Sequence, residues 1–252
     1  MGSKGGAKHL KRKPAPRVWM VTRKKYTWIT KPSPGPHPID RCLPLTLVLR
    51  DFLGFAKTAK EAKTIVAQGK VCVDGKICRD EAYPAGIMDV ITIPEVGHSY
   101  RVLPSPKGLI LHPISKEEAA FKLCRIENKT AVPNGHVQLN LHDGTCTLIR
   151  VADPKNPSED TYRTLGTLKI NLPTREVLGY LKLGKGTHVI LVGGKNVGKH
   201  GKIVELEETA GQKKRAQLVT VEDNRGNRFQ TTVNQVLVIG DAEPSISLPE
   251  VR

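Results

Sequence analysis

Apolar residues first recur with a helical period in the segment that follows Cys42. Four of them lie at spacings of three and four, and they are Leu45, Val48, Leu49 and Phe52. This spacing predicts one buried face of a helix. Leu43-Pro44 is suited to open that helix, because proline is tolerated where the first N–H groups have no partner. Gly54 then interrupts the pattern.

A second helix and a hairpin are predicted directly after this interruption. Thr58-Ala59-Lys60-Glu61 has the spacing of a capping box, in which the first and fourth side chains bind free backbone N–H groups. The residues that would face inward are Ala62, Ile65 and Val66. Gly69 is a natural C-terminal stop. Asp74-Gly75 then predicts a tight turn between two short strands in the segment 71–77.

Short strands dominate the middle of the chain. YPAGIMDVITI (83–93) predicts a turn and a strand, and alternation predicts strands in 137–142 and 168–172. Asp143-Gly144 predicts a turn that leads back into a strand at 145–149. Ser115-Lys116-Glu117-Glu118 is a second capping box, which predicts a short helix through about Leu123. The simplest interpretation is a small antiparallel β domain with one helix, from about residue 95 to 175.

Five further short strands follow at regular spacing near the C-terminus. They are predicted in 177–183, 187–192, 202–207, 217–222 and 228–233. Five such strands suit a small, strongly bent barrel of the SH3 type. The chain has 252 residues, of which 38% are hydrophobic and 4% aromatic, so we expect two to four small units with modest cores.

Positive charge is concentrated at the N-terminus. The chain has 40 Lys and Arg against 24 Asp and Glu, a net charge of +16, which favours a polyanionic partner. The first 39 residues contain no acid, but they contain ten bases: Lys4, Lys8, Lys11, Arg12, Lys13, Arg17, Arg23, Lys24, Lys25 and Lys31. The same stretch holds Trp19, Trp28 and Tyr26, and it ends in the proline-rich run 31–38.

This N-terminal stretch has too few aliphatic residues to bury a core of its own. We interpret residues 1–40 as a basic arm that orders on nucleic acid, with cations on phosphates and aromatic rings such as Trp19 on bases or a partner surface. The alternative is a disordered tail that only adds solubility. A solubilising tail requires no tryptophan, so the arm is favoured.

The two predicted helices carry a second group of candidate phosphate contacts. These are Arg50 on the first helix and Lys57, Lys60, Lys63 and Lys70 around the second. Lys60 and Lys63 are three residues apart and therefore share a face. An ordinary solvated face would mix acids with bases, whereas only Glu61 intervenes here. Phosphate contact is the favoured interpretation.

GGKNVGKHG (193–201) is one residue short of a nucleotide-binding P-loop. Such a loop needs a Ser or Thr after the lysine to hold magnesium, and a helix that starts there. His200 occupies the hydroxyl position, and Gly201 is followed by a strand-like pattern. We therefore expect a glycine-rich loop that binds a phosphate chain rather than a nucleotide, with an idle hairpin turn as the alternative. The candidate contacts are Lys195, Asn196, Lys199, His200 and Lys202.

Other chemistry is not indicated. The five cysteines are scattered without a C-x-x-C pair, so no zinc site or disulfide framework is expected, and His142 with Cys146 is too little for a metal site. No apolar run has membrane length, no secretory signal is evident, and no basic amphipathic helix suits a membrane surface. No catalytic grouping, cofactor or small-molecule substrate is expected.

Two segments resemble known RNA-binding modules. CLPLTLVLRDFLGFAKTAKEAKTIVAQGKVCVDGK (42–76) resembles the α-L-type domain of ribosomal proteins and RNA-modifying enzymes, which implies that Arg50, Lys57, Lys60 and Lys63 grip RNA. The chain departs from that family at Thr58-Ala59, where a Ser-Arg pair is frequent, so position 59 offers no charge. GTHVILVGGKNVGKHGKIVEL (186–206) resembles the KOW motif of ribosomal proteins and transcription elongation factors.

The order of these segments resembles one family throughout, the archaeal and eukaryotic small-subunit ribosomal proteins called "four-e". The likeness is carried by KHLKRKPAP (8–16), PGPHPIDRCLPL (34–45), YPAGIMDVITI, KLCRI (122–126), LHDGT (141–145), GGKNVGKHG and VLVIGDAEPSISLP (236–249). It implies a non-catalytic, ribosome-bound cytoplasmic protein whose partners are small-subunit (16S-type) ribosomal RNA and neighbouring small-subunit proteins. The end soon after SISLP indicates an archaeal source.

The expected fold is therefore α+β and multi-domain. Its parts are a basic arm (1–40), an α-L-type RNA-binding domain (41–94), a central β-rich domain (95–175), a KOW SH3-like barrel (176–240) and a tail (241–252). An RNA-modifying enzyme and a free transcription or translation factor remain the alternative functions. Such an enzyme would need a catalytic acid or base at a strand end, and the central segment offers no candidate.

Overall fold

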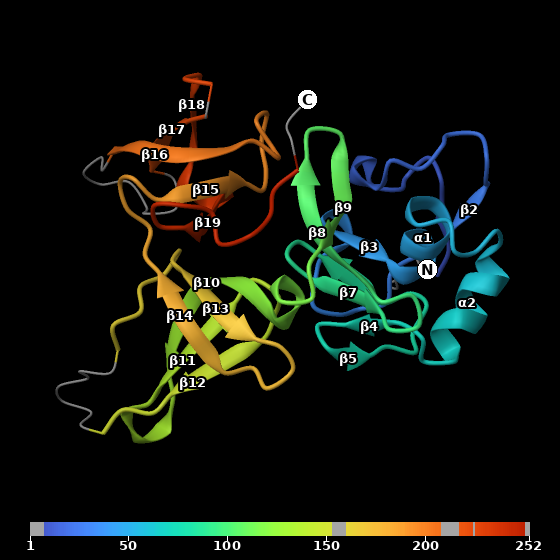
Figure 1. Ribbon diagram of the computed structural model, residues 1–252, viewed down its shortest axis with the longest axis horizontal. Helices are drawn as coiled ribbons and strands as arrows, with labels where there is room; N and C mark the ends of the chain where they lie inside the picture. The colour runs from blue at the N-terminus through green and yellow to red at the C-terminus, as the bar shows by residue number, and fades with distance from the viewer. Residues whose placement is uncertain (1–7, 153–159, 208–216, 224, 250–252) are drawn as a thin grey trace, which may run out of the picture. The chain divides into compact units, whose positions relative to one another are not determined.

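A computed structural model describes four stretches of the chain (Figure 1). They are residues 8–152, 160–207, 217–223 and 225–249. The chain forms two compact units, each described separately below. Unit 1 comprises Met1–Leu103 and Lys107–Pro113, and unit 2 comprises Pro104–Pro106 and Ile114–Arg252.

The first predicted helix is present in unit 1 as two short consecutive turns. α1 (Leu45–Leu47) continues directly into the π-helical turn η3 (Val48–Phe52), which Leu53 closes by donating its N–H to the Val48 carbonyl. The predicted apolar face is buried except at Phe52, which is half-buried. The hydrophobic period therefore located this helix correctly.

The second helix, α2 (Ala59–Ala67), begins at its predicted cap. The Glu61 N–H donates to Thr58 Oγ1 at 3.2 Å, and the Glu61 carboxylate in turn accepts the Lys57 N–H at 2.8 Å. Ala62 and Val66 are buried as expected. Gly69 ends the helix with a left-handed φ of 75°.

A five-stranded sheet of unit 1 follows the helices, in the order β5-β4-β7-β8-β9. Asp74-Gly75 makes the predicted turn, and both residues have positive φ, as a tight hairpin requires. The strands are β4 (Cys72–Val73), β5 (Lys76–Ile77), β7 (Val90–Ile93), β8 (His98–Ser105) and β9 (Gly108–Ile114). Because β8 pairs with β7, the predicted domain boundary at residues 94–95 is wrong.

The described part of the N-terminal arm is folded into unit 1. β1 (Leu10–Lys11) pairs with β2 (Trp28–Ile29), and two 3-10 turns are present, η1 (Arg17–Trp19) and η2 (Ile39–Arg41). Trp19 is 1% exposed, and its Nε1–H donates to the Cys42 carbonyl at 2.6 Å. Cys42 opens β3 (Cys42–Pro44), which pairs with β6 (Pro84–Gly86). The arm does not form a separate unit, and its Trp19 and Ile29 are buried in unit 1 together with the residues that follow it.

The first sheet of unit 2 corresponds to the predicted central domain, and its order is β12-β11-β10-β13-β14. The strands are β10 (Phe121–Ala131), β11 (Val137–Leu141), β12 (Cys146–Ile149), β13 (Thr167–Asn171) and β14 (Val177–Leu181), and a 3-10 turn, η5 (Pro133–Gly135), separates β10 from β11. Its buried core is formed by Cys124, Ile126, Leu139, Leu141, Leu168 and Ile170.

The helix predicted for the central domain is wrong beyond one turn. Ser115 Oγ does accept the Glu118 N–H at 3.2 Å, but only η4 (Glu118–Ala120) follows. Phe121 already belongs to β10, where it pairs with Asn171 of β13. Long-range strand pairing and core burial override the local helix signal here.

The second sheet of unit 2 has the order β18-β17-β16-β15-β19. Its strands are β15 (His188–Leu191), β16 (His200–Glu207), β17 (Leu218–Glu222), β18 (Arg228–Thr232) and β19 (Val236–Gly240), with a 3-10 turn, η7 (Val233–Gln235), before the last. The assignment of 177–183 to this sheet is wrong, because β14 forms a hairpin with β13 instead. The fifth strand is β19, whose five residues are all buried.

Candidate nucleic-acid interface

Two exposed lysines, Lys57 and Lys60, lie at the start of α2. The next one, Lys63, is also exposed, but its Nζ lies 2.8 Å from Glu81 Oε1. That hydrogen bond and the charge of Glu81 raise the pKa of Lys63, so it is charged and partly compensated. Lys70 is likewise paired, with its Nζ 3.1 Å from Glu95 Oε1. The two lysines here that form no ion pair with another described residue, Lys57 and Lys60, therefore lie at the N-terminal end of the helix, close to the Glu61 carboxylate.

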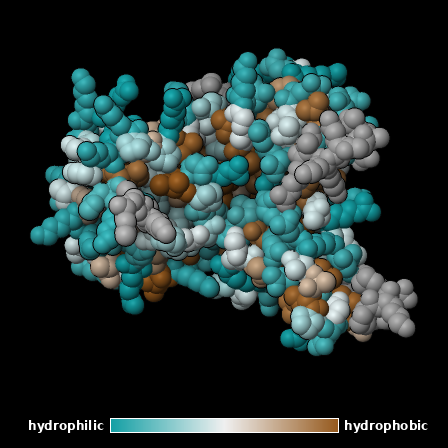
Figure 2. All heavy atoms as spheres, turned by 180° about the vertical axis from the view of Figure 1, so that it is seen from behind, coloured by the Kyte–Doolittle hydropathy of each residue, from teal (hydrophilic) through white to brown (hydrophobic). Residues whose placement is uncertain are grey.

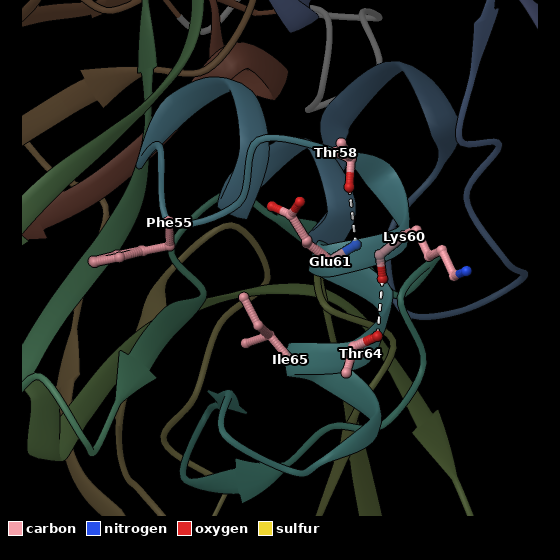
Figure 3. A pocket seen from close by; sticks show the side chains of 6 residues that line it. All are labelled: Phe55, Thr58, Lys60, Glu61, Thr64 and Ile65. Atoms are coloured by element: carbon pink, nitrogen blue, oxygen red, sulfur yellow. Dashed lines mark hydrogen bonds between the residues drawn. The ribbon is translucent and has the colours of Figure 1, made fainter.

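A shallow depression of about 410 Å³ lies beside α2 (Figure 3). It is lined by Phe55, Thr58, Lys60, Glu61, Thr64 and Ile65. In Figure 3 the side chains of Phe55, Glu61 and Ile65 border one side of the helix, whereas Lys60 extends to the other side. The Lys57 N–H keeps the pKa of Glu61 below its usual value. A phosphate is therefore repelled from the depression and attracted to the Lys60 side.

Arg50 was predicted to contact RNA, and the structure contradicts this prediction. Its side chain is 6% exposed, and its Nη2 lies 2.7 Å from Asp51 Oδ2. The guanidinium carbon lies 4.0 Å from the ring centroid of Tyr26, in a cation–π contact. Arg50 therefore ties the arm to the first helix. The neighbouring acid at 51 was visible in the sequence, but the long-range contact with Tyr26 was not.

Seven of the predicted cations in the arm have exposed side chains. These are Lys8, Lys11, Lys13, Arg17, Arg23, Lys24 and Lys25, while Lys4 lies outside the described residues. Arg12 is half-buried, and its Nε and Nη2 both donate to the Val21 carbonyl, so it closes the loop of the arm. Trp19 was expected to stack on bases or a partner, and its burial makes it a core residue instead. Trp28, which was not singled out, is the exposed tryptophan.

The glycine-rich loop connects β15 directly to β16, which confirms strand–loop–strand in place of a P-loop. The loop is closed by hydrogen bonds from the Gly198 N–H to the Leu191 carbonyl and from the Leu191 N–H to the Lys199 carbonyl, at 2.8 and 2.9 Å. Gly198 has a φ of 81°, and a Cβ there would lie 2.6 Å from Ser105 Cα. Gly198 therefore allows the loop to pack closely against Ser105 within unit 2.

Of the five candidate contacts in and beside this loop, Lys195 and Lys202 are exposed and Asn196 is half-buried. Lys199 Nζ lies 4.9 Å from the ring centroid of Phe229. His200 was expected to supply a cation, but burial lowers its pKa from an ordinary value near 6.5. The imidazole is therefore neutral at pH 7, and the prediction for His200 is corrected.

Other kinds of site are not indicated within the described stretches. No cluster of three or more His, Cys, Asp or Glu side chains there is arranged to hold a metal ion. The helices described are all too short or too polar to cross a bilayer. On the face shown in Figure 2, hydrophilic side chains cover most of the surface and are interrupted by smaller apolar patches. The candidate contacts that remain are therefore the exposed cations described above.

Three family models match successive segments of the chain, and these segments are similar to the arm, the helical segment and the central sheet described above. The S4 domain model matches residues 45–91, which contain the two helices and the hairpin. The RS4NT (NUC023) domain model matches residues 4–40, the N-terminal arm. The model of ribosomal family S4e matches residues 96–177, which include most of the central sheet.

Full-length relatives carry the same family name. The chain is 53% identical over 251 residues to the small ribosomal subunit protein eS4 of Staphylothermus marinus and 54% identical over 251 residues to that of Desulfurococcus amylolyticus, with 99% of each chain covered. The crystal structure of the 30S ribosomal protein S4e from Thermoplasma acidophilum superimposes with a TM-score of 0.66 at 29% identity, covering 81% of this chain and 97% of that one. The resemblance drawn from the sequence is thus confirmed, and the chain belongs to ribosomal family S4e.

Proposed function

We propose that this protein is a non-catalytic component of the small ribosomal subunit that binds ribosomal RNA through several separate basic surfaces. The observation that carries the proposal is the identity of 53% and 54%, over 99% of the chain, to two proteins called small ribosomal subunit protein eS4. The S4 domain model over residues 45–91 supports RNA as the ligand.

The arm and the start of α2 are the proposed RNA contacts of unit 1. Seven exposed arm cations have no acid nearby in the sequence, since the first acidic residue of the chain is Asp40. Lys57 and Lys60 add two charges without a carboxylate partner of the kind that Lys63 has. Each phosphate that these cations neutralise releases condensed counterions, which is a strong and salt-dependent source of affinity.

The second sheet of unit 2 is the proposed third contact, as a KOW-type SH3-like barrel. Its glycine-rich loop lies between two antiparallel strands, β15 and β16, and presents Lys195 to solvent. Lys202 is exposed on β16 shortly after the loop. These two lysines are the loop contacts that we retain, with Lys199 and Asn196 as partly covered contributors.

The geometry of this loop supports a binding role rather than nucleotide hydrolysis. A P-loop requires a helix whose first hydroxyl holds magnesium. Here His200 occupies that position and is the first residue of β16. The loop therefore lacks both the magnesium ligand and the helix N-terminus on which the phosphates of a nucleotide would lie.

Sedimentation of cell extracts tests the proposal. We propose 16S-type ribosomal RNA and neighbouring small-subunit proteins as partners, in the cytoplasm. Most of the protein should then sediment with small subunits on a sucrose gradient in moderate salt, and ribonuclease should release it. A cellular pool that sediments as a free protein and does not respond to ribonuclease would overturn the proposal.

A further inference from the structure

The β1–β2 ribbon of the arm has two different faces. Lys11 lies directly opposite Trp28, and Leu10 lies opposite Ile29. Because side chains alternate along a strand, each pair occupies one face. Ile29 is buried against unit 1, whereas Trp28 is 55% exposed. The ribbon therefore packs one face on the protein and holds an indole and an ammonium group in solvent on the other.

The exposed indole is oriented by its neighbours and remains open. Lys11 Nζ lies 5.3 Å from the Trp28 ring centroid, within cation–π range. The His9 ring meets it at 5.6 Å between centroids and 62° between planes. More than half of the Trp28 surface thus stays in contact with water. Exposure of this apolar ring is unfavourable in the free protein, and a flat apolar ligand that covers the ring would remove that cost.

We propose that Trp28 is a base-stacking platform for an unpaired nucleotide of ribosomal RNA, with Lys11 on the adjoining phosphate. This inference rests on the proposed function. Unpaired bases offer a free aromatic face, whereas bases in an A-form helix are stacked on one another. The ligand is RNA rather than a protein surface because the first 39 residues contain ten Lys and Arg residues and no Asp or Glu. This positive charge is complementary to a chain of phosphates.

The other candidate aromatic rings of unit 1 are less suited to this role. Trp19 is buried and uses its Nε1–H internally. Tyr26 carries the Arg50 guanidinium over its ring at 4.0 Å and Lys25 Nζ at 5.3 Å. Phe55 is exposed, but it borders the depression that contains the Glu61 carboxylate, which repels phosphate. Trp28 combines an open ring with a lysine ammonium group beside it.

Tryptophan fluorescence tests this proposal directly, because Trp19 and Trp28 are the two tryptophans of the chain. A stacked base quenches indole emission. The full-length protein is titrated with a small-subunit rRNA transcript from Staphylothermus marinus, and separately with inorganic polyphosphate, which has charge but no bases. We expect rRNA to quench the wild type strongly and the Trp28→Phe variant weakly, since only buried Trp19 emits there. Polyphosphate should quench neither.

Binding affinity provides the second measurement. Trp28→Ala should bind the transcript roughly five- to 150-fold more weakly, the range for loss of one base–aromatic stack, and Trp28→Phe should lie between it and the wild type. If the wild type binds rRNA tightly while Trp28 emission and the Trp28→Ala affinity stay unchanged, the stacking site is refuted and the proposed function stands. Quenching by isolated small-subunit proteins but not by the transcript assigns Trp28 to a protein neighbour and also refutes the stacking site. A wild type that does not bind rRNA refutes both.

Discussion

Lys122 and Asp143 form a buried ion pair in the central sheet, with Nζ 3.1 Å from Oδ2 and side chains that are 2% and 4% exposed. Asp143 Oδ1 also accepts the Thr145 N–H at 3.1 Å and its hydroxyl at 2.6 Å. Burial alone would raise the pKa of Asp143, but the Lys122 charge and the Thr145 hydrogen bonds outweigh it and lower that pKa. The aspartate of the predicted Asp143-Gly144 turn is thus also the counter-charge of a core lysine.

Asp143→Asn should destabilise the protein by about 3 to 5 kcal/mol, because it leaves the Lys122 ammonium buried without a counter-charge. The free energy of unfolding in urea measures this effect. Asp241→Asn is the matched control, since Asp241 is exposed, and it should change stability by less than about 0.5 kcal/mol. Equal effects of the two variants would show that the buried pair contributes nothing specific.

The same pair predicts how stability depends on pH. The pKa of Asp143 is lower in the folded protein than in the unfolded chain, where aspartate titrates near 3.9. The unfolded state therefore binds this proton first as the pH falls. The contribution of Asp143 is complete above about pH 5 and is lost progressively as the pH decreases through about 4 and below. Unfolding free energies at pH 6 and pH 3 should differ less in Asp143→Asn than in the wild type.

Local signals in the sequence were sufficient for the helices and hairpin of the S4 segment. Thr58 caps α2, Gly69 ends it, and Asp74-Gly75 turns the chain, because each effect involves residues only a few positions apart. Partners that are distant in sequence were not predictable in this way. Glu81 compensates Lys63 from a different part of the fold, so charge spacing on one helix overestimated the free positive charge.

Burial of individual residues in the arm was also beyond the sequence. Trp19 and Trp28 lie in the same basic, proline-bounded stretch, and nothing local distinguishes them. The decisive contact is long-range, from the Trp19 Nε1–H to the carbonyl of Cys42. Likewise, periodicity identified the strand at 177–181 but did not reveal that it pairs with β13 rather than with the C-terminal strands. The alternation of apolar and polar residues shows which face of a strand is buried. It does not show which neighbouring strand it pairs with, because that depends on which core the strand completes.

The two tryptophans should therefore differ sharply in their effect on stability. Trp19→Ala removes a fully buried ring and its hydrogen bond, and it should cost about 3 to 5 kcal/mol. Trp28→Ala changes an exposed side chain and should cost less than about 1 kcal/mol. Thermal or urea unfolding of the full chain measures both. Similar losses would mean that the arm does not pack as described.

Salt dependence of rRNA binding tests the phosphate contacts at the start of α2. Lys57→Gln with Lys60→Gln removes two exposed charges without touching the core. The slope of log K against log salt concentration should become shallower by about 1.5, for two lost contacts. Lys116→Gln is the control and should leave the slope unchanged, because Lys116 is followed by two acids, Glu117 and Glu118. Equal slopes for the double variant and the wild type would remove α2 from the interface.

Two glycines of unit 2 allow the cost of steric crowding in the glycine-rich loop to be measured separately from the cost of a left-handed φ. Gly198 and Gly226 have similar φ values, 81° and 78°. A Cβ at Gly198 would lie 2.6 Å from Ser105 Cα and 2.9 Å from Pro106 Cδ, whereas a Cβ at Gly226 meets nothing within 4 Å. Gly226→Ala should therefore cost about 1 kcal/mol, from φ alone.

Gly198→Ala should cost clearly more than Gly226→Ala, because the backbone at Ser105 must shift in addition. Urea unfolding of the two variants gives the difference. The same preparations should neither hydrolyse ATP or GTP nor retain a magnesium nucleotide, and Lys199→Ala should change neither result, because β16 follows the loop where a P-loop has its helix. Equal destabilisation of the two glycine variants would show that the close approach of Gly198 to Ser105 adds nothing to the cost of the left-handed φ. Nucleotide turnover that disappears in Lys199→Ala would contradict the non-catalytic assignment of the loop.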